Sequence, residues 1–210
     1  MLKIQVNGGS LFLDESQQIH LPLEQHLKDA HVEHFSIPGK SNQSIVMDVY
    51  EHINKFDIFV LNFTFTDRFP LWLDDYQFEM SMGRIIPGML PLPKFEANAD
   101  FLEETIIKFT KMYYKYFCNI EYNNKFNNML VDSCILLLKQ HNKKFILSNC
   151  QALNIIDPER QYWYNDPTAS VYDSTTWTKF LDKQFGHLPK QHFGLLSQEI
   201  FEFGIQNNIW

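Results

Sequence analysis

Hydrophobic positions along the chain follow two periods, one typical of strands and one typical of helices. Leu2, Ile4 and Val6 recur at every second position, which predicts a short strand that ends in a turn at residues 7–10. Residues 57–63 form a nearly continuous apolar run, as expected for a strand buried on both faces of a parallel sheet. Further strands are expected at 32–37 and 144–148, and helices at 21–30, 42–53, 99–118, 127–141, 176–183 and 189–203.

Residues 69–98 follow neither period. They combine four prolines with methionine and aromatic residues, which predicts an irregular loop or lid with short helical pieces. The chain shows no internal repeat and no linker, so we expect a single domain over residues 1–210. Strands that alternate with helices predict an α/β fold, a three-layer α/β/α sandwich around a mainly parallel sheet.

Composition and charge exclude several classes of protein. The chain has 210 residues, 45% of them hydrophobic, and a net charge of −7. An acidic chain without a basic stripe argues against a nucleic-acid partner, because phosphate binding needs clustered Lys and Arg. No run of about 18 apolar residues and no signal-peptide pattern occurs, so we expect no membrane span and a cytoplasmic location. Three widely spaced cysteines favour free thiols over disulfides or a zinc site.

Polar turns follow three of the predicted strands, and a histidine segment precedes the last helix. In parallel sheets ligands bind beyond the carboxyl ends of the strands, so these turns are candidate site elements. Each one alone also fits an ordinary structural role, such as a strand-to-loop turn, a helix cap or a solvated histidine. The four segments are 7–10 (Asn-Gly-Gly-Ser), 37–42 (Ile-Pro-Gly-Lys-Ser-Asn), 62–68 (Asn-Phe-Thr-Phe-Thr-Asp-Arg) and 184–192, which includes His187.

The order of these four segments resembles the SGNH (GDSL-type) hydrolase family. That family has a Gly-Asp-Ser turn after its first strand, a glycine after its second, an Asn-bearing turn after its third and an Asp-x-x-His segment before its last helix. Here Ser10 stands at the first position and Gly39 at the second. Thr64, or Asn62, stands at the third, and Gln184 and His187 stand at the fourth. The resemblance implies a flavodoxin-like sandwich. We expect no cofactor, and no metal site at the nearby histidines His31 and His34, because no Cys or carboxylate stands at ligand spacing.

The resemblance also implies an acyl-transfer site. Ser10 would be the nucleophile and His187 the general base that takes its proton. The backbone N–H groups of Ser10 and Gly39 would stabilise the oxyanion, with Thr64 or Asn62 as a third donor. Two further residues in these segments are candidates for binding the substrate, namely Asn42 and Arg68.

Two departures from the family pattern concern supporting roles. Gly9 replaces the usual Asp, and Gln184 replaces the acid that orients the histidine, although Asp182 or an Asp of the preceding loop could take that place. We expect a serine esterase that cleaves a small ester, such as an O-acetyl group on a carbohydrate, through an acyl-Ser10 intermediate. The alternatives are a catalytically weakened or inactive glycan- or ligand-binding protein of the same fold, and an O-acyltransferase.

Aromatic residues gather between the fourth predicted strand and the last helix. Residues 162–164 read Tyr-Trp-Tyr, and Trp177 follows in the same region. Aromatic rings fill protein cores and also stack on sugar rings, so the cluster predicts either core packing or an exposed platform for a carbohydrate.

Overall fold

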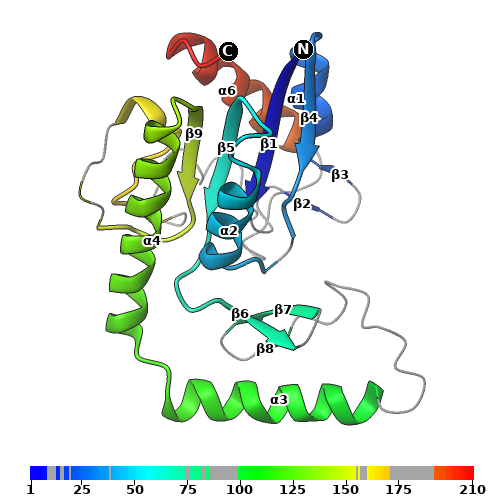
Figure 1. Ribbon diagram of the computed structural model, residues 1–210, viewed down its shortest axis with the longest axis vertical. Coiled ribbons are helices and arrows are strands. Elements are labelled where there is room, and N and C mark those ends of the chain that lie inside the picture. The colour runs from blue at the N-terminus through cyan, green and yellow to red at the C-terminus, as the bar shows by residue number, and fades with distance from the viewer. Residues whose placement is uncertain are drawn as a thin grey trace.

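A four-stranded parallel sheet forms the centre of the molecule in the computed structural model. Its strand order is β4 (Ala30–His34), β1 (Leu2–Gly8), β5 (Ile58–Phe63) and β9 (Lys144–Asn149), with every neighbouring pair parallel (Figure 1). The predicted parallel sheet is therefore confirmed. The structure describes residues 1–8, 13–14, 17–18, 20–37, 39–73, 76–81, 84–85, 99–154, 156, 160–170 and 192–210.

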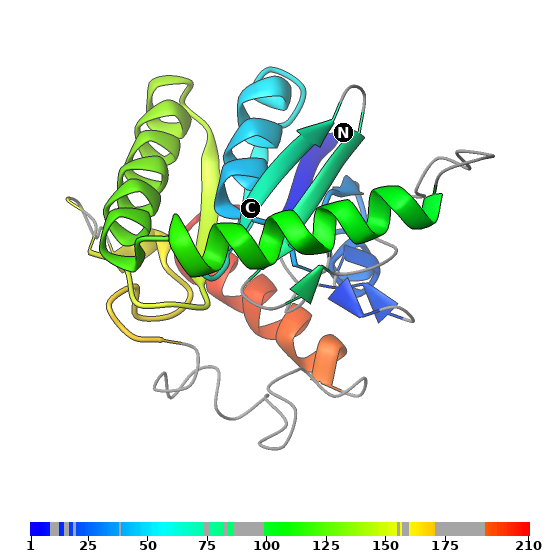
Figure 2. The ribbon, with the colours of Figure 1, turned by 90° about the horizontal axis from the view of Figure 1, so that it is seen from below.

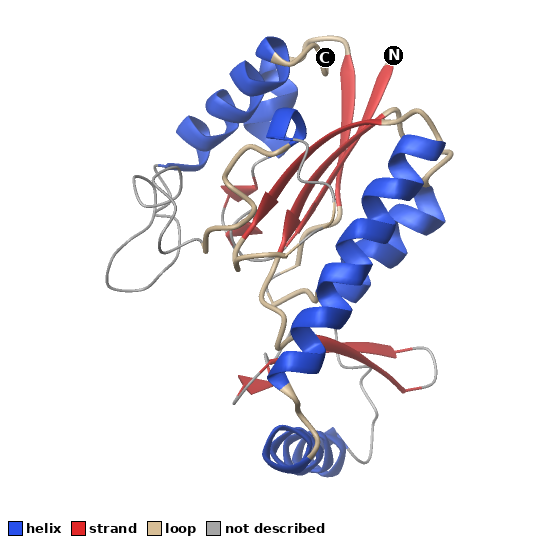
Figure 3. Cartoon of the chain, turned by 90° about the vertical axis from the view of Figure 1, so that its left-hand side faces the viewer, coloured by secondary structure: helices blue, strands red, loops and turns tan. Residues whose placement is uncertain are grey.

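Helices cover both faces of this sheet, which confirms the three-layer α/β/α arrangement. On one face, α1 (His20–His26) and α6 (His192–Gln206) pack in a buried apolar cluster with strand residues such as Val6 and Val60. On the other face, α2 (Asn42–His52) and α4 (Ile120–Gln140) pack in a second cluster with residues such as Phe59 and Leu61 (Figure 3). Successive strand residues point to opposite faces, so both faces of β5 are apolar.

Local sequence explains where two of these helices begin. The side chain of Ser41 accepts a hydrogen bond from Ser44 N at 3.2 Å and caps α2, as expected. Asn119 accepts from Tyr122 N at 2.9 Å and caps α4, which therefore starts seven residues before the predicted 127. The first turns of α4 carry exposed aromatic side chains such as Tyr122 and contribute little to the core, so hydrophobic periodicity does not reveal them.

The interpretation of residues 69–98 as an irregular loop with short helical pieces is wrong for the described residues between 69 and 85. These residues form an antiparallel sheet of β6 (Phe69–Leu73), β7 (Tyr76–Ser81) and β8 (Arg84–Ile85). Pro70 is tolerated because β6 is an edge strand of this sheet. Residues 86–98 and the predicted helix 176–183 lie outside the described residues. Three further short elements are β2 (Leu13–Asp14), β3 (Gln17–Gln18) and the 3-10 helix η1 (Arg160–Tyr162).

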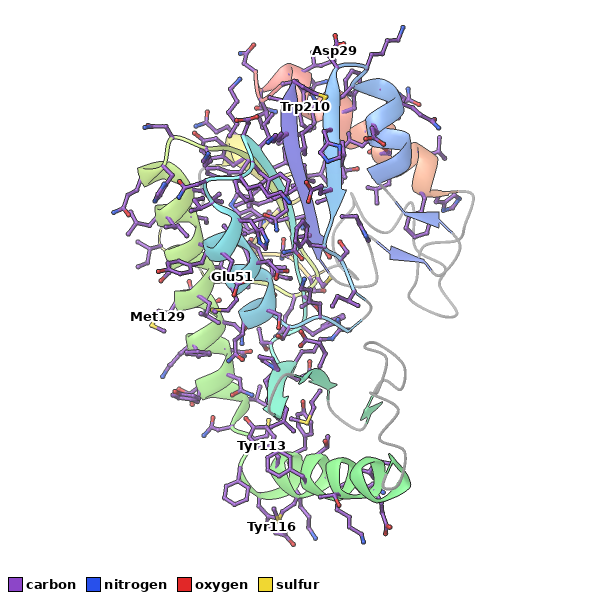
Figure 4. The ribbon with its side chains drawn as sticks, turned by 45° about the vertical axis from the view of Figure 1, so that its right-hand side comes forward. Asp29, Glu51, Tyr113, Tyr116, Met129 and Trp210 are labelled. Atoms are coloured by element: carbon purple, nitrogen blue, oxygen red, sulfur yellow. The ribbon has the colours of Figure 1, made fainter. Side chains whose placement is uncertain are left out.

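Helix α3 (Ala99–Tyr116) lies against this second sheet, beyond the carboxyl edge of the central one (Figure 2). The rings of Tyr113 and Phe69 are 4.3 Å apart, and Thr110 Oγ1 lies 3.0 Å from Met80 Sδ. Tyr113 therefore faces the second sheet, whereas Tyr116 is 67% exposed on the opposite side of the helix (Figure 4). Across the described part of the chain, no helix combines the length and apolarity needed to cross a bilayer.

Candidate functional site at the carboxyl edge of the sheet

The strand order locates the candidate site. From β1 the chain passes first to β4 on one side and then to β5 on the other, so the connections change direction between β1 and β5. Ligands of open α/β sheets bind at the carboxyl ends of the strands at such a point. In this protein that point lies beyond Gly8 and Phe63, the last residues of β1 and β5. The first and third predicted turns begin there.

The segments that enter the first and second turns lie side by side at this edge. The backbone continues to pair beyond β4, because Phe35 N donates to Val6 O at 2.8 Å and Ile37 N donates to Gly8 O at 3.2 Å. Gly8 therefore lies next to the segment that enters the second turn. Ser10 lies outside the described residues, but two residues of chain reach no further than about 7 Å from Gly8.

Gly39 has the backbone conformation that the second turn requires. Its φ of 74° lies in the left-handed region, where an L side chain is strained and glycine is not. Lys40 N donates to Ile37 O at 3.2 Å and closes the turn around it. Within the described residues the Gly39 amide N–H has no backbone acceptor. This amide is therefore suited to bind an oxyanion or another acceptor.

Asn42 joins the second turn to the third. Its Oδ1 accepts from Thr64 N at 2.6 Å, and its Nδ2 donates to Thr64 O at 3.2 Å and to Asn127 Oδ1 at 2.9 Å. Both Asn42 and Thr64 are fully buried. The amide of Asn42, a predicted substrate-binding group, is thus occupied by contacts within the protein, and it holds the backbone of Thr64 in place.

The Thr64 hydroxyl is bound by the predicted substrate-binding arginine. Arg68 Nη1 donates to Thr64 Oγ1 at 2.6 Å, and the guanidinium lies over the ring of Phe65, 5.1 Å from its centroid. Since Arg68 uses an acceptor lone pair of the hydroxyl, the hydroxyl proton is left to be donated. A neighbouring positive charge makes such a hydroxyl a stronger donor. The structure therefore brings Asn42, Thr64 and Arg68 into one hydrogen-bonded group.

Helix α4 contributes residues to this turn that the sequence analysis did not identify. Asn127 Nδ2 donates to Thr66 O at 3.2 Å, and Thr66 Oγ1 donates to Asn124 Oδ1 at 2.5 Å. Gln151, just beyond β9, accepts from Thr66 N at 3.1 Å through its Oε1. A polar residue on an otherwise apolar helix face was the available signal, because Asn127 shares the buried face of α4 with Val131, Cys134 and Leu138.

Asn62 lies apart from this group. It alternates with Ile58 and Val60 in β5 and shares their face of the sheet. Its Nδ2 donates to Ser148 Oγ on β9 at 2.9 Å, and the side chain is fully buried. Of the two candidates for a third oxyanion donor, Thr64 is the one that contacts the other predicted site residues.

Charged side chains, two of them buried, adjoin the second turn. Lys40 contacts Asp48 of α2, and Glu79 of β7 accepts from Ser41 N at 3.0 Å. Burial lowers the pKa of Lys40, and the nearby Asp48 carboxylate opposes that effect. Burial raises the pKa of Glu79, against hydrogen bonds from Ser44 and Ser41. The second sheet is thus linked to the α2 N-terminus through a carboxylate.

The first residues of α6 lie at the same edge of the sheet. Phe193 packs in one cluster with Val6 and with Cys150, which directly follows β9. The far end of the chain lies at the opposite edge, where Lys144 Nζ donates to Asn208 O at 3.0 Å. His187 lies outside the described residues, but the five residues that separate it from His192 span at most about 18 Å. Gln184 and Asp182 also lie outside the described residues.

The aromatic segment 162–164 contributes to packing. Trp163 is 4% exposed and contacts Phe63, with ring centroids 6.3 Å apart. Tyr162 packs on Phe145, with centroids 4.3 Å apart. The core-packing alternative is therefore confirmed for Trp163, while Trp177 lies outside the described residues.

One further nucleophilic group, the thiol of Cys150, directly follows β9 at this edge. The Cys150 thiol is buried, and burial raises its pKa to about 12, so it stays protonated at neutral pH. No cluster of three or more His, Cys, Asp or Glu side chains in a metal-binding arrangement occurs among the residues that the structure describes. In the described region, the arrangement thus offers hydrogen-bond donors and one arginine.

Comparisons with known proteins give similarity in solved structures only. No protein-family model and no curated protein matches the chain. A lipase/acylhydrolase from Enterococcus faecalis is 14% identical, with a TM-score of 0.42, over 97% of this chain and 95% of that one. Esterase EstA from Pseudoalteromonas sp., inhibited by monoethylphosphonate, is 9% identical, with a TM-score of 0.46, over 97% of each chain. An acetyl xylan esterase, AlAXEase, is 14% identical, with a TM-score of 0.34, over 99% of this chain and 74% of that one.

Proposed function

We propose that this protein is an ester hydrolase of the SGNH type, with Ser10 as the nucleophile and His187 as the general base. The observation that carries the proposal is the pairing of Ile37 with Gly8, which sets the segments that enter the first and second turns side by side at the carboxyl edge of the sheet. The positive φ of Gly39 supports it, because a glycine turn after a strand can offer a backbone N–H to an oxyanion. The position of the α6 N-terminus supports it as well, since the segment with His187 leads into this helix.

In the proposed reaction, Ser10 Oγ attacks the ester carbonyl carbon while His187 takes the hydroxyl proton. The N–H groups of Ser10 and Gly39 bind the oxyanion, and the Thr64 hydroxyl is the third donor; each such donor is typically worth about 3 kcal/mol of barrier. The C–O bond then breaks, and His187 returns the proton to the leaving alcohol. Water attacks the acyl-serine by the same steps in reverse, which releases the acid and the free serine.

Gln184 is the orienting group in this proposal. Its side-chain carbonyl can hold the tautomer of the His187 imidazole, although it lacks the negative charge that stabilises an imidazolium. Loss of that carboxylate in a Ser-His-Asp system costs about 10⁴-fold in turnover, so we expect a slow enzyme unless Asp182 takes the role.

The substrate class that we propose is an ester of a small acyl group, such as acetate, on a sugar. The buried position of Trp163 gives no support to a glycan-binding platform in this segment.

The proposal predicts that the purified protein hydrolyses p-nitrophenyl acetate and reacts with a fluorophosphonate probe at Ser10. Ser10→Ala and His187→Ala should each lower the hydrolysis rate by about 10³-fold or more, because both residues act as one unit. Gln184→Asp should raise the rate, since a carboxylate stabilises the imidazolium. Hydrolysis is followed by absorbance, and the labelled peptide is identified by mass spectrometry.

Matched controls come from residues on exposed surfaces away from this edge. Ser133→Ala on α4 and His141→Ala just after it should leave both hydrolysis and labelling unchanged, because both side chains are exposed. Hydrolysis by Ser10→Ala at the rate of the unchanged protein would refute Ser10 as the nucleophile. Activity on the acetate ester without activity on an O-acetylated oligosaccharide would refute the sugar substrate and leave the esterase.

A further inference from the structure

The carboxylate of Asp48 contacts two chain segments that belong to different turns. Its Oδ2 accepts from Asn7 Nδ2 at 2.9 Å, and the same oxygen contacts Lys40 Nζ. Asn7 lies in β1 and Lys40 follows β4, whereas Asp48 itself belongs to the second turn of α2. One carboxylate oxygen on a helix thus ties together the ends of two neighbouring strands.

These two segments carry the groups that the proposed function requires. Asn7 precedes Ser10 by three residues, and Lys40 directly follows Gly39. The N–H groups of Ser10 and Gly39 are the proposed oxyanion donors. Donors of this kind stabilise a transition state only if their positions are set before the charge develops. Asp48 therefore lies where it can set the spacing of the two donors without contacting the substrate.

The ammonium of Lys40 has a defined position because it is enclosed. Its side chain is 4% exposed, against 23% for Asp48, and its Nζ also donates to Phe35 O at 2.6 Å. Replacing a buried ion pair by apolar residues of similar size is often neutral or stabilising, so stability alone gives weak reason for such a pair. Its directed hydrogen bonds, in contrast, fix the geometry of the segments that it joins.

We propose that Asp48 and Lys40 form a positioning pair that holds the two oxyanion turns in register for the acyl-transfer step. The inference rests on the proposed function and adds to it two residues that do not contact the substrate. It assigns to the pair an effect on turnover that is separate from its effect on folding.

The test is the double variant Lys40→Met/Asp48→Leu, which removes both charges and leaves neither one buried alone. We expect only a moderate fall in its melting temperature, because neither charge of the pair is left buried alone, while buried Glu79 loses a nearby positive charge and Asn7 Nδ2 loses an acceptor. We expect kcat for p-nitrophenyl acetate to fall by about 10- to 100-fold, as misplacement of reacting groups by about 1 Å does. KM should change by less than about threefold, since the substrate contacts remain. Amide hydrogen exchange in peptides 3–8 and 35–42 should become faster.

The matched control is the double variant Lys55→Met/Glu33→Leu. This lysine and glutamate also link β4 to the chain just beyond α2, but both are partly exposed and lie away from the turns. It should leave kcat and the exchange of both peptides unchanged. A kcat of Lys40→Met/Asp48→Leu equal to that of the unchanged protein would overturn the inference, because the pair would then act on stability alone.

A failure of the proposed function would give a different result. In that case the fluorophosphonate probe would not label Ser10 even in the protein without substitutions. If Ser10 is labelled, an unchanged labelling rate in the double variant would overturn the positioning role. The exchange measurement needs no turnover and tests the tether by itself. Unchanged exchange in both peptides would show that Asp48 does not hold them, whatever the activity.

Discussion

At the scale of single residues, the candidate site differs from the SGNH pattern at the third turn. Thr64 stands at the position of an asparagine, and the structure binds its backbone to Asn42 and its hydroxyl to Arg68. The only donor that Thr64 can still offer is its hydroxyl proton. Any role in binding an oxyanion therefore depends on one O–H group whose direction Arg68 controls.

Thr64→Val removes this O–H group while keeping the shape of the side chain. We predict that kcat for p-nitrophenyl acetate falls by about 10- to 100-fold, somewhat less than the loss of a full oxyanion donor. Thr64→Ser, which keeps the hydroxyl, should retain most of the activity. Steady-state kinetics of the two variants decide the matter. Equal kcat in Thr64→Val and the unchanged protein would assign Thr64 to structure alone.

At the scale of elements, the second sheet is attached to the central domain through the start of α2. Glu79 of β7 is 6% exposed and accepts from Ser41 N, where the helix dipole favours a negative charge. Burial nevertheless raises its pKa above the ordinary value of 4.5. The folded protein therefore binds a proton at Glu79 more tightly than the unfolded chain does.

This difference predicts a pH dependence of stability. The contribution of Glu79 is fully present below about pH 4.5 and is lost as the pH rises through its folded-state pKa. Glu79→Gln abolishes this titration. Its melting temperature relative to the unchanged protein should therefore rise between about pH 4 and about pH 7. Thermal unfolding at several pH values measures the trend.

Glu33 is the control for the sign of this effect. The hydrogen bond from Lys55 lowers its pKa, so its contribution is present at neutral pH and lost as the pH falls. The relative melting temperature of Glu33→Gln should therefore fall with rising pH, by a small amount because this side chain is partly exposed. A flat difference for Glu79→Gln would show that Glu79 does not titrate as inferred.

At the scale of the whole molecule, the last residues close one of the two apolar clusters. Trp210 packs against the cluster beneath α6, and its Nε1 donates to Phe201 O at 2.7 Å. A Cβ added to Gly204 would lie 2.1 Å from that nitrogen. The chain end thus needs a glycine on α6 in order to pack against the same face as α1.

Gly204→Ala should lower the free energy of unfolding by about 1–3 kcal/mol, because it forces the indole out of its place. Gly194→Ala, in the same helix, is the control. A Cβ there meets no atom within 4 Å, so stability should stay the same or rise by up to about 1 kcal/mol. Urea unfolding followed by circular dichroism compares the two. Equal effects would show that contact with Trp210 is unimportant.

The elements of the fold followed from the sequence where hydrophobic period was strong. The all-buried run of β5, the alternation in β1 and the cap at Ser41 were sufficient to predict a parallel α/β sandwich. The prediction was wrong at β6–β8, where Pro70 and a weak alternation obscured the strands. The predicted start of α4 was also wrong by seven residues, because its first turns carry exposed aromatic residues.

For the site, the residue order shows which polar residues follow each strand, and these residues gather at one edge because the carboxyl ends of parallel strands meet there. What each of them contacts followed from the packing of the folded chain. It turned Asn42 inward onto Thr64, set Asn62 on the face beneath α6 and joined Asn7 to Lys40 through Asp48. Hydrogen bonds between residues tens of positions apart depend on how the helices pack on the sheet. The periodicity of hydrophobic residues along the chain does not predict that packing.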